Sequence, residues 1–423
     1  MWGYFFAILS KETALAILGV VPLVLYFFTN TSLQKITTQT VFFGVVAAVY
    51  FAIRMNIVDS NPEPFGIIDN SLFAIDTTFG RLATAIGMVG EYFKLLIFPH
   101  PLSFDYSYNT FPELGWGNWK VLTSLVSIIG LAYVAIKGLA EKNLLSFCIL
   151  FFAITFGITS NIFFLIGATF AERFMFVPSL GFCLAVSYLF HKYLKAEKSK
   201  PPTSFYVIIG VFVLLYFIKT FSQNKVWKSD ETLFATGIHV APNSTRTQSF
   251  YGVMNYRKAL LPENANRKNE LLQISEEYLK KSLATYSGFT EAYQHLAATY
   301  EAQNRLELSL QTYKDALKTK PDYFPAMTNY GIVAYKLKRY AEAESYLQQS
   351  LEYAPNNITT IRALGLTYRE QGKFNLAIQE FEKALDAYYT VQHLTDLGMT
   401  YEQMGDPAKA QFYNQKILEF KQQ

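Results

Sequence analysis

The run SFYVIIGVFVLLYFIKTF at residues 204–221 contains a single charged residue, Lys219, whereas residues 222–243, SQNKVWKSDETLFATGIHVAPN, contain four. The whole chain changes character at this boundary. Residues 1–221 carry 14 Lys and Arg and 11 Asp and Glu, and residues 222–423 carry 23 and 22 in a shorter stretch. The first composition is typical of helices in lipid and the second of a surface in water. The sequence therefore predicts two regions with different solvents.

Seven segments of the first region are apolar enough to cross a bilayer. A helix needs about 20 apolar residues to cross roughly 30 Å of hydrocarbon. The candidate spans are residues 13–28, 36–57, 81–98, 119–138, 144–166, 174–191 and 204–221. We therefore predict an all-α fold in which residues 1–221 form a transmembrane bundle of about seven spans.

The beginning of the chain is apolar but too short to span a bilayer. Ser10-Lys11-Glu12 interrupts residues 1–9 before the next apolar helix. No basic segment or small-residue cleavage site precedes this run, so a cleaved signal peptide does not fit. We interpret residues 1–9 as the last turns of a helix whose beginning is missing, which would make the bundle N-terminally incomplete. A short interfacial helix is the alternative.

Lysines in short loops predict the orientation of the bundle. Four lysines lie between the last two spans, namely Lys192, Lys195, Lys198 and Lys200. That loop is expected in the cytoplasm, and the last span then delivers residues 222–423 to the opposite side, together with the 99–118 loop. The same count places residues 58–80 inside, although they are acidic and contain no lysine. The conflict disappears if part of residues 60–98 forms a re-entrant or interfacial hairpin.

From Thr290 onward the second region repeats with a period of 34 residues. Equivalent positions hold Leu296-Ala297, Tyr330-Gly331, Leu364-Gly365 and, after 33 residues, Leu397-Gly398. Small residues recur in the second half of the repeats at Ala343, Ala377 and Ala410, and Pro321 and Pro355 close two repeats. Small residues let antiparallel helices pack closely, and aromatic residues fill the gap to the next pair. This is the tetratricopeptide repeat (TPR) pattern, which predicts an α-solenoid.

The two patterns predict the domain organisation. Residues 222–243 are expected to form a linker helix and residues 244–289 a degenerate TPR, with a polar insert at Pro262–Asn269. Residues 290–423 are predicted to hold four repeats, at 290–323, 324–357, 358–390 and 391–423.

The first helix of each repeat should line the concave face of the stack. In this register the face carries Gln294, Glu301, Thr328, Tyr335, Arg362 and Arg369. These residues either bind a protein or peptide or form an ordinary solvated surface, and the sequence does not choose between the two. None of them implies catalysis. The balanced charge gives no indication of nucleic-acid binding.

Ionisable groups near the predicted spans are costly in lipid, so each is a candidate functional residue. The candidates are Lys11, Glu12, Arg81, Glu91, Lys94, Asp105, Glu172 and Arg173, together with Tyr106 in the aromatic loop 100–108. Each charged candidate near a helix also has a structural interpretation. Glu91 and Lys94 can pair at i, i+3 spacing, the arginines can reach the headgroups, and Glu172 can favour a helix N-terminus. The alternative is a site for a lipid-linked phosphate, which arginine and lysine bind well.

Four motifs, followed by the TPR array, resemble one family. They are LSKETA at 9–14, RLAT at 81–84, PLSFDYS at 101–107 and AERFMFVPSLGF at 171–182. In this order they are similar to the transmembrane-and-TPR O-mannosyltransferases and their bacterial relatives, of the GT-C glycosyltransferase class. The Asp-Tyr-Ser and Ala-Glu-Arg blocks are the most specific, and the resemblance covers nearly the whole chain.

The resemblance implies inverting transfer of a sugar, typically mannose, from a polyprenyl- or dolichyl-phosphate donor to a Ser or Thr hydroxyl outside the cytoplasm. It implies a carboxylate as general base and cations that stabilise the departing phosphate. Candidates for the phosphate site are Lys11, Arg81 and Arg173, and the supporting polar residues are Glu12, Asp105, Tyr106 and Glu172. The TPR region would present or select the protein acceptor.

The main acidic residues of the GT-C class lie in the first extracytoplasmic loop, which the resemblance places upstream of Met1. We therefore expect the catalytic base outside residues 1–423 and an inactive chain on its own. A divalent metal is conceivable in the full-length enzyme, although the five scattered histidines show no ligand spacing.

Two other functions remain open from the sequence. The first is a membrane-anchored TPR scaffold that recruits partners to an envelope or secretory complex. The second is a protein like an O-antigen polymerase or ligase, for which a long outer loop with paired arginines would be expected and is not visible. Cys148 and Cys183 lie in apolar runs and are expected to be reduced. Few cysteines and compact loops favour a bacterial inner membrane, with the TPR region outside the cytoplasm.

Overall fold

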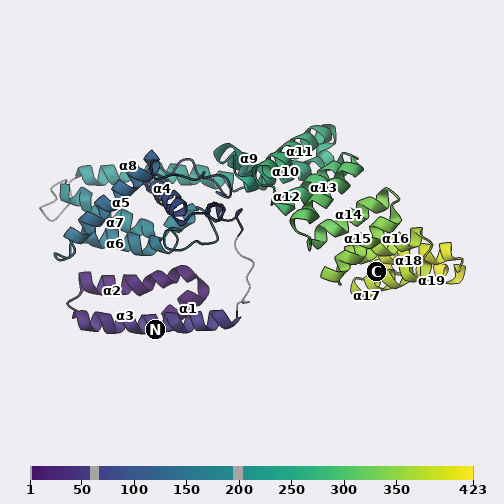
Figure 1. Cartoon of the computed structure of the whole chain (residues 1–423), viewed down its shortest axis with the longest axis horizontal. Helices are drawn as coiled ribbons and strands as arrows, with labels where there is room; N and C mark the ends of the chain where they lie inside the picture. Colours follow the sequence, from purple (N-terminus) through teal and green to yellow (C-terminus); the bar gives the residue numbers. More distant parts are fainter. Residues whose placement is uncertain (1, 58–65, 194–202, 423) are drawn as a thin grey trace. The chain divides into compact units, whose positions relative to one another are not determined.

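The computed structural model describes residues 2–57, 66–193 and 203–422 (Figure 1). Every regular element in these residues is a helix, so the predicted all-α class is confirmed. The chain forms two compact units, Met1–Thr247 and Gln248–Gln423. Lys195, Lys198 and Lys200, on which the predicted orientation depends, lie outside the described residues, as do residues 58–65.

In the part of the first unit that the structure describes, there are eight apolar or amphipathic α-helices and one α-helix of the predicted linker. They are α1 (Trp2–Ser10), α2 (Ile17–Phe28), α3 (Leu33–Ile57), α4 (Thr78–Ile97), α5 (Trp119–Lys137), α6 (Leu144–Gly157), α7 (Pro178–Tyr193), α8 (Thr203–Val226) and α9 (Asp230–Val240). In the described residues, α3, α5 and α8 are the three helices long and apolar enough to cross a membrane. Of the remaining predicted spans, 13–28 and 144–166 appear as shorter apolar helices.

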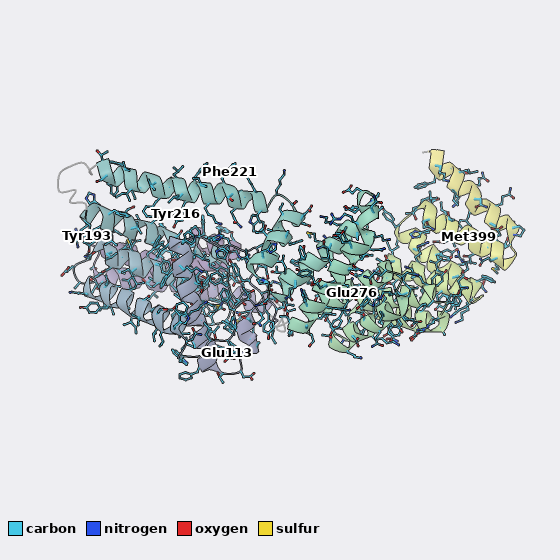
Figure 2. All side chains as sticks on the ribbon, turned by 90° about the horizontal axis from the view of Figure 1, so that it is seen from above. Glu113, Tyr193, Tyr216, Phe221, Glu276 and Met399 are labelled. Atoms are coloured by element: carbon cyan, nitrogen blue, oxygen red, sulfur yellow. The ribbon has the colours of Figure 1, made fainter. Side chains whose placement is uncertain are left out.

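Side chains of α8 project outward along its length, including Phe221, which is 59% exposed (Figure 2). None of its apolar window is buried in the protein. A long helix that leaves such side chains uncovered in water would be unfavourable, because burial of apolar surface stabilises by about 25 cal/mol per Å². Lipid is the solvent that suits this helix.

The two ends of the first unit differ in the segments that connect its helices. At one end, the α2–α3 and α5–α6 connections meet, because Lys142 Nζ donates to the Thr29 carbonyl (3.3 Å) and the Tyr26 hydroxyl donates to the Leu139 carbonyl (3.2 Å). The other end gathers the long connecting segments, including residues 102–107 and 167–173, around one cavity. The first end thus has short turns and the second holds the candidate site.

Helix α4 does not fit the span predicted at 81–98. Residues before and after it, Asp69 and Asp105, line the same cavity. The loop that follows α4 also returns to its N-terminal half, where Leu114 N donates to Thr84 Oγ1 (3.0 Å). The described part of residues 60–98 holds a short 3-10 turn, η2 (Ser71–Ala74), and the single continuous helix α4, which is not among the helices long and apolar enough to cross a membrane.

Polar contacts give the physical reason why α4 departs from a simple span. Arg81 Nε donates to the Ile75 carbonyl (2.7 Å). Glu91 pairs with Lys94 (3.2 Å), as its spacing predicted, and also with Lys120 at the start of α5 (3.0 Å). Arg81 and Glu91 are therefore held by contacts outside α4, and Lys94 pairs with Glu91 within the helix.

The second unit is a stack of antiparallel helix pairs. The pairs are α10 (Thr245–Ala259, whose first turn belongs to the first unit) with α11 (Lys268–Thr285), α12 (Thr290–Ala302) with α13 (Leu306–Thr319), α14 (Phe324–Lys336) with α15 (Tyr340–Tyr353), α16 (Ile358–Glu370) with α17 (Phe374–Ala387), and α18 (Val391–Met404) with α19 (Pro407–Gln422). A short 3-10 turn, η4 (Pro262–Arg267), occupies most of the polar insert. The predicted TPR solenoid is confirmed.

Small residues and fully buried aromatic residues hold the pairs together. At Gly331 an added Cβ would lie 2.5 Å from Leu347 Cγ, so only glycine allows this approach of α14 to α15. Tyr313, Tyr330 and Phe381 are at most 1% exposed and fill the space between neighbouring helices. The core therefore follows from the period of small and aromatic positions in the sequence.

Candidate functional site

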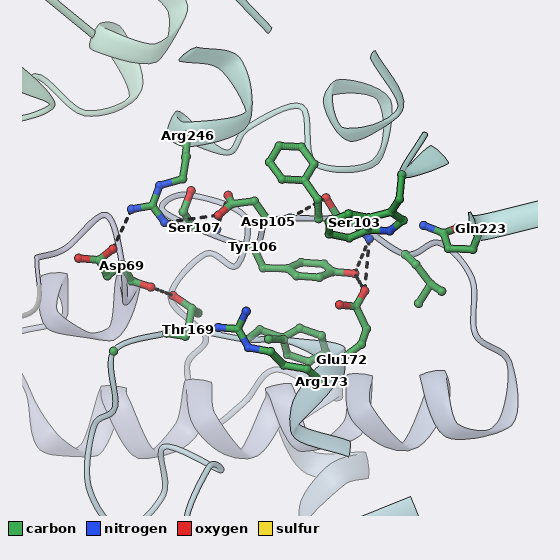
Figure 3. A pocket seen from close by; sticks show the side chains of 17 residues that line it. Asp69, Ser103, Asp105, Tyr106, Ser107, Thr169, Glu172, Arg173, Gln223 and Arg246 are labelled. Atoms are coloured by element: carbon green, nitrogen blue, oxygen red, sulfur yellow. Dashed lines mark hydrogen bonds and ion pairs between the residues drawn. The ribbon is translucent and has the colours of Figure 1, made fainter. Parts of the chain in front are cut away.

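A cavity of about 420 Å³, here called the polar cavity, opens at the loop-rich end of the first unit (Figure 3). Its lining comes from five separate parts of the chain: Asp69, residues 102–107, residues 167–173, the pair Gln223 and Trp227, and Arg246. The 98–118 loop is positioned by α9, since a Cβ on Gly237 would lie 2.2 Å from Phe104 Cε1. The polar cavity thus depends on segments that are far apart in sequence.

Arg246 ties two carboxylates together at one corner of the polar cavity (Figure 3). Its Nη2 lies 2.7 Å from Asp69 Oδ1 and its Nη1 lies 3.5 Å from Asp105 Oδ1. Asp105 Oδ2 also accepts hydrogen bonds from Ser107 N and Ser244 Oγ, both at 2.9 Å. One guanidinium between two carboxylates balances part of their repulsion and fixes their positions.

Glu172 and Tyr106 form a second polar corner. The Tyr106 hydroxyl donates to Glu172 Oε1 at 2.5 Å, and Ser103 N lies 3.3 Å from the same oxygen. Burial raises the pKa of the Glu172 carboxyl, and it also raises the pKa of Tyr106. A buried carboxylate costs free energy unless donors satisfy it. The Glu172 carboxyl is therefore a buried hydrogen-bonding group, and the donors Tyr106 and Ser103 stabilise its charged form.

Buried amide and hydroxyl side chains hold the backbone around the polar cavity. Asn70 Nδ2 donates to Asn161 Oδ1 (2.9 Å), and Asn161 Nδ2 donates to the carbonyls of Ala168 (3.0 Å) and Thr169 (3.1 Å). Thr169 N in turn donates to the Asp69 carbonyl (3.1 Å). Satisfied buried networks of this kind rigidify a site.

A second and larger cavity of about 770 Å³, here called the cationic cavity, lies beside the N-terminal helices. Its walls are mainly apolar, with Ile8, Leu9, Leu15, Phe51, Ile53, Ile57, Ile158, Phe164, Ile166 and Phe174 among them. The charged residues in the wall are Lys11, Glu12, Arg54 and Arg173, and Glu12 forms an ion pair with Arg54. An apolar cavity with an excess of cations suits a ligand that is both apolar and anionic.

The two cavities share part of their walls. Gly167, Ala168 and Arg173 line both of them. Arg173 is held beside the Phe174 ring, with its guanidinium carbon 5.5 Å from the ring centroid. Its positive charge is therefore at the boundary between an acidic, polar cavity and an apolar, cationic one.

The structure brings most of the sequence-predicted residues into these two places. Lys11, Glu12 and Arg173 line the cationic cavity, and Asp105, Tyr106 and Glu172 line the polar cavity together with Arg173. Arg81 lines neither and is held by the Ile75 carbonyl.

Sequence reasoning missed Arg54, Asp69 and Arg246. Arg54 lies in the last turn of an apolar helix, a position that could have marked it as a candidate. Asp69 and Arg246 are separated by 177 residues, and no pattern in a single sequence indicates that they meet.

Among the described residues, no group of three or more His, Cys, Asp or Glu side chains is placed to hold a metal ion. Asp69 and Asp105 already share Arg246 as a cation.

The residues predicted to share one TPR face have different surroundings in the structure. Gln294 accepts a hydrogen bond from Tyr323, and Glu301 pairs with Lys336 (3.0 Å). Thr328 is 5% exposed and bonds to the hydroxyls of Ser350 and Thr360, so it faces the helix interface instead of the groove. A cavity of about 360 Å³, here called the groove cavity, retains the other end of the predicted face. Its lining is Ile332, Tyr335, Ile358, Thr359, Arg362, Ala363, Leu366, Tyr388, Thr390 and His393.

Three helices with the length and composition of membrane spans, followed by helix pairs with TPR packing, define the class: an all-α protein with an apolar helical region and a TPR solenoid. Tetratricopeptide repeat family models match residues 290–323, 322–390 and 394–423.

The chain is a distant homologue of the TMTC protein O-mannosyl-transferases, which carry TPR repeats. It is 25% identical over 383 residues to protein O-mannosyl-transferase TMTC3 of Homo sapiens, covering 79% of this chain and 41% of that protein. It is 26% identical to Tmtc3 of Drosophila melanogaster over 302 residues, covering 70% and 28%. The chain thus spans well under half the length of these relatives. The solved structure of MamA (41-end) from Desulfovibrio magneticus RS-1 covers 40% of this chain and 96% of its own at 20% identity, with a TM-score of 0.35.

Proposed function

We propose that the chain is a membrane glycosyltransferase-like protein that takes part in moving a mannose-type sugar from a polyprenyl-phosphate donor to a Ser or Thr hydroxyl of a protein. The observation that carries the proposal is the position of Arg173 in the wall of both cavities. A cation at that boundary is where the phosphate of a lipid-linked donor meets a polar acceptor. The distant homology to TMTC proteins supports the same reaction class.

The cationic cavity is the proposed donor site. Its apolar walls suit a polyprenyl chain, and Lys11 and Arg173 supply positive charge for the phosphate. Arg54 adds a third cation but is already paired with Glu12. Negative charge that develops on a departing phosphate in a water-poor cavity is strongly stabilised by fixed cations. Arg173 would therefore stabilise the phosphate as the bond to the sugar breaks.

The polar cavity is the proposed acceptor side. Asp105, held by Arg246, and Glu172, held by Tyr106, offer carboxylate oxygens that can accept a hydrogen bond from a Ser or Thr hydroxyl. The proposal assigns these residues to binding and orientation of the acceptor. It leaves the general base of the reaction unassigned.

The proposed topology follows from the basic residues. Lys35, Lys137, Lys142 and Lys192 are at or near the ends of helices or turns away from the polar cavity, and cytoplasmic loops are rich in lysine. At the other end, Lys11, Arg54 and Arg173 line the cationic cavity and Lys120 pairs with Glu91, so the proposal assigns these cations to a ligand or to contacts within the protein. We therefore propose an integral membrane protein, of a bacterial inner membrane, with both the polar cavity and the TPR unit outside the cytoplasm.

The donor site can be tested by photo-crosslinking. The full chain in liposomes would be irradiated with a diazirine-bearing polyprenyl phosphate, and covalent labelling measured by mass spectrometry. Arg173→Met and Lys11→Met should each reduce labelling about tenfold or more, since each removes a cation from the site. Arg81→Met is the matched control, because Arg81 belongs to a similar motif but lines neither cavity. Equal labelling of all four proteins would refute the donor site.

A membrane-anchored TPR scaffold is the second candidate function, and it is favoured by the TPR family matches in the C-terminal half. Sugar transfer to a membrane-protein acceptor, followed in native membranes of cells that carry Arg173→Met in the full-length protein, separates the two. Loss of transfer with normal membrane insertion supports the enzyme. Unchanged transfer with loss of a partner after groove substitutions supports the scaffold.

A further inference from the structure

Two side chains at the end of α8, Gln223 and Trp227, line the polar cavity but belong to neither of its carboxylate corners. Gln223 lies in the last turn of α8, and Trp227 follows directly after the helix. Figure 3 shows Gln223 on the side of Glu172, away from Asp69 and Arg246. The polar cavity therefore has a side that the ion pairs of Arg246 do not occupy.

Helix caps fix the turn that carries Trp227. Thr232 Oγ1 donates to the Val226 carbonyl (2.9 Å) and completes the capping box at the start of α9. A capping box satisfies the free donors at a helix start and so stabilises the turn before it. Helix α9 in turn packs on the loop after α4, where the ring centroids of Phe104 and Phe234 lie 5.3 Å apart. Trp227 is therefore held in place relative to Phe104 in the cavity wall.

Most of the Trp227 side chain is uncovered by protein, since the residue is 59% exposed. Exposed indoles in membrane proteins are often anchors in the headgroup region. Trp119, at the start of α5, fits that role, because it is 68% exposed and lines none of the three cavities described above. Trp227 differs in that it lines a polar cavity together with an amide, where its ring can contact a ligand.

Gln223 adds hydrogen-bonding capacity to the same side of the cavity. In the part of the chain that the structure describes, its side chain has no hydrogen-bond partner. An amide offers two donors and one acceptor, and the indole Nε1 of Trp227 is a further donor. A flat aromatic ring beside such groups suits a ligand that has an apolar face and hydroxyls around its edge.

We propose that Gln223 and Trp227 form a subsite for the pyranose ring of a sugar. The C–H face of the ring stacks on the indole, whose π-face carries partial negative charge, and the amide bonds to neighbouring hydroxyls. The cavity volume of about 420 Å³ falls in the range of about 300–1,000 Å³ that is common for small-molecule sites. The inference rests on the proposed function, because it places the sugar of that reaction.

Saturation-transfer difference NMR on the full chain in phospholipid nanodiscs tests the subsite, since nanodiscs avoid detergents with sugar headgroups. The probe is methyl α-D-mannopyranoside. Glycerol, which has hydroxyls but no ring, is the negative probe. The ring protons of the mannoside should receive saturation from the protein, and those of glycerol should not.

Substitutions separate stacking and hydrogen bonding from mere stability. Trp227→Ala should weaken mannoside binding about tenfold, whereas Trp227→Phe should weaken it about threefold or less, because it keeps an aromatic face. Gln223→Leu should weaken it about fivefold, because leucine cannot form hydrogen bonds. Trp119→Ala is the matched control, which removes an exposed indole outside the cavity and should leave mannoside binding unchanged.

Two further probes identify the source of the sugar ring. Citronellyl phosphomannose carries the ring on a short lipid phosphate, as a donor does, and O-mannosyl-serine amide carries it on an acceptor that is already modified. Tighter binding of the first assigns the subsite to the donor sugar, and tighter binding of the second assigns it to the modified acceptor. In both cases Trp227→Ala should weaken the binding.

The proposal is overturned if the mannoside receives no saturation, or if Trp227→Ala binds it as well as the unmodified chain does. If Trp227→Ala does not fold, Gln223→Leu decides by the same comparison. Binding of the mannoside requires neither transfer nor a lipid phosphate. Its failure therefore leaves the proposed donor site standing, and failure of donor labelling leaves the sugar subsite standing.

Discussion

Helices α8 and α17 are both regular, but each leaves a different part of its surface uncovered. None of the apolar window of α8 is buried in the protein. Helix α17 buries Ala377, Ile378, Phe381 and Ala384 and presents charged residues outward. The difference teaches that an apolar side chain stabilises the two regions by different means: through contact with lipid in α8 and through contact with neighbouring helices in α17.

The two units also differ in where their charged side chains lie. In the first unit, Asp69, Asp105 and Arg246 converge on a cavity from distant parts of the chain. In the second unit, most ion pairs bridge neighbouring turns or repeats at the surface, as Arg339 does with Glu307. Charged side chains therefore build a site in the first unit, whereas in the second unit most of them form ion pairs on a solvated surface.

The largest predicted effect compares two phenylalanines. Phe381 is fully buried between TPR helices, and Phe217 on α8 is 65% exposed. Phe381→Ala should lower the free energy of unfolding of the TPR unit by about 3–5 kcal/mol, because it removes buried surface and leaves a cavity. Phe217→Ala should change stability by less than about 0.5 kcal/mol. Hydrogen exchange of the full chain in detergent, resolved by helix, measures both.

The two substitutions are matched in chemistry, so the comparison isolates the surroundings of the ring. Hydrogen exchange in helices α14 to α19 should accelerate in Phe381→Ala and remain unchanged in Phe217→Ala. Equal acceleration in both variants would mean that α8 packs against protein rather than lipid, and the division between the two helices would fail.

The next effect compares two arginines that pair with carboxylates. Arg246→Gln leaves Asp69 and Asp105 near each other without their shared cation, and should cost about 1–3 kcal/mol of unfolding free energy. Arg339→Gln breaks a surface pair and should cost at most about 1 kcal/mol. Chemical denaturation of the full chain in detergent, followed by fluorescence, compares them. If Arg246→Gln lowers the free energy of unfolding no more than Arg339→Gln does, the ion pairs of Arg246 with Asp69 and Asp105 are as weak as an exposed surface pair.

The helices that could be predicted are those that a repeated or continuous local pattern of residues produces. The 34-residue period of Tyr330-Gly331 and Leu364-Gly365 predicted the helix pairs, because close packing requires small residues at fixed intervals. The composition of residues 204–221 predicted a long apolar helix in the same way. Helix α4 was taken as a simple span because its apolar content is high, but its charges are satisfied by contacts that apolar content does not register.

The candidate site was predictable only in part. Local motifs indicated Asp105, Glu172 and Arg173, since each lies in a short distinctive block. The partner of Asp105, Arg246, lies in another segment, and only the fold brings the two together. Arg81 was chosen for its charge at a helix start, yet the fold turns it toward a backbone carbonyl. Long-range pairing of side chains is the information that one sequence does not carry.

The smallest predicted effect is on the pH dependence of stability, and it is measured at two glutamates. Burial raises the pKa of Glu172, whereas the hydrogen bond from Tyr330, aided by Lys314, lowers the pKa of Glu342. A raised carboxyl pKa stabilises the fold below the ordinary value of 4.5, and this contribution is lost as pH rises through the raised pKa. A lowered pKa stabilises above 4.5, and the contribution is lost as pH falls through the lowered pKa.

Replacement of each glutamate by glutamine should therefore shift stability in opposite directions. Relative to the unmodified chain, Glu172→Gln should gain stability between pH 4 and pH 7, and Glu342→Gln should lose it over the same interval, with each change smaller than that of Arg246→Gln. Thermal unfolding at half-unit steps of pH measures both. If the change in stability has the same sign in the two variants, water reaches Glu172 in the polar cavity as freely as it reaches Glu342 on the repeat surface. The cavity would then lack the buried carboxyl on which its proposed role in orienting a hydroxyl depends.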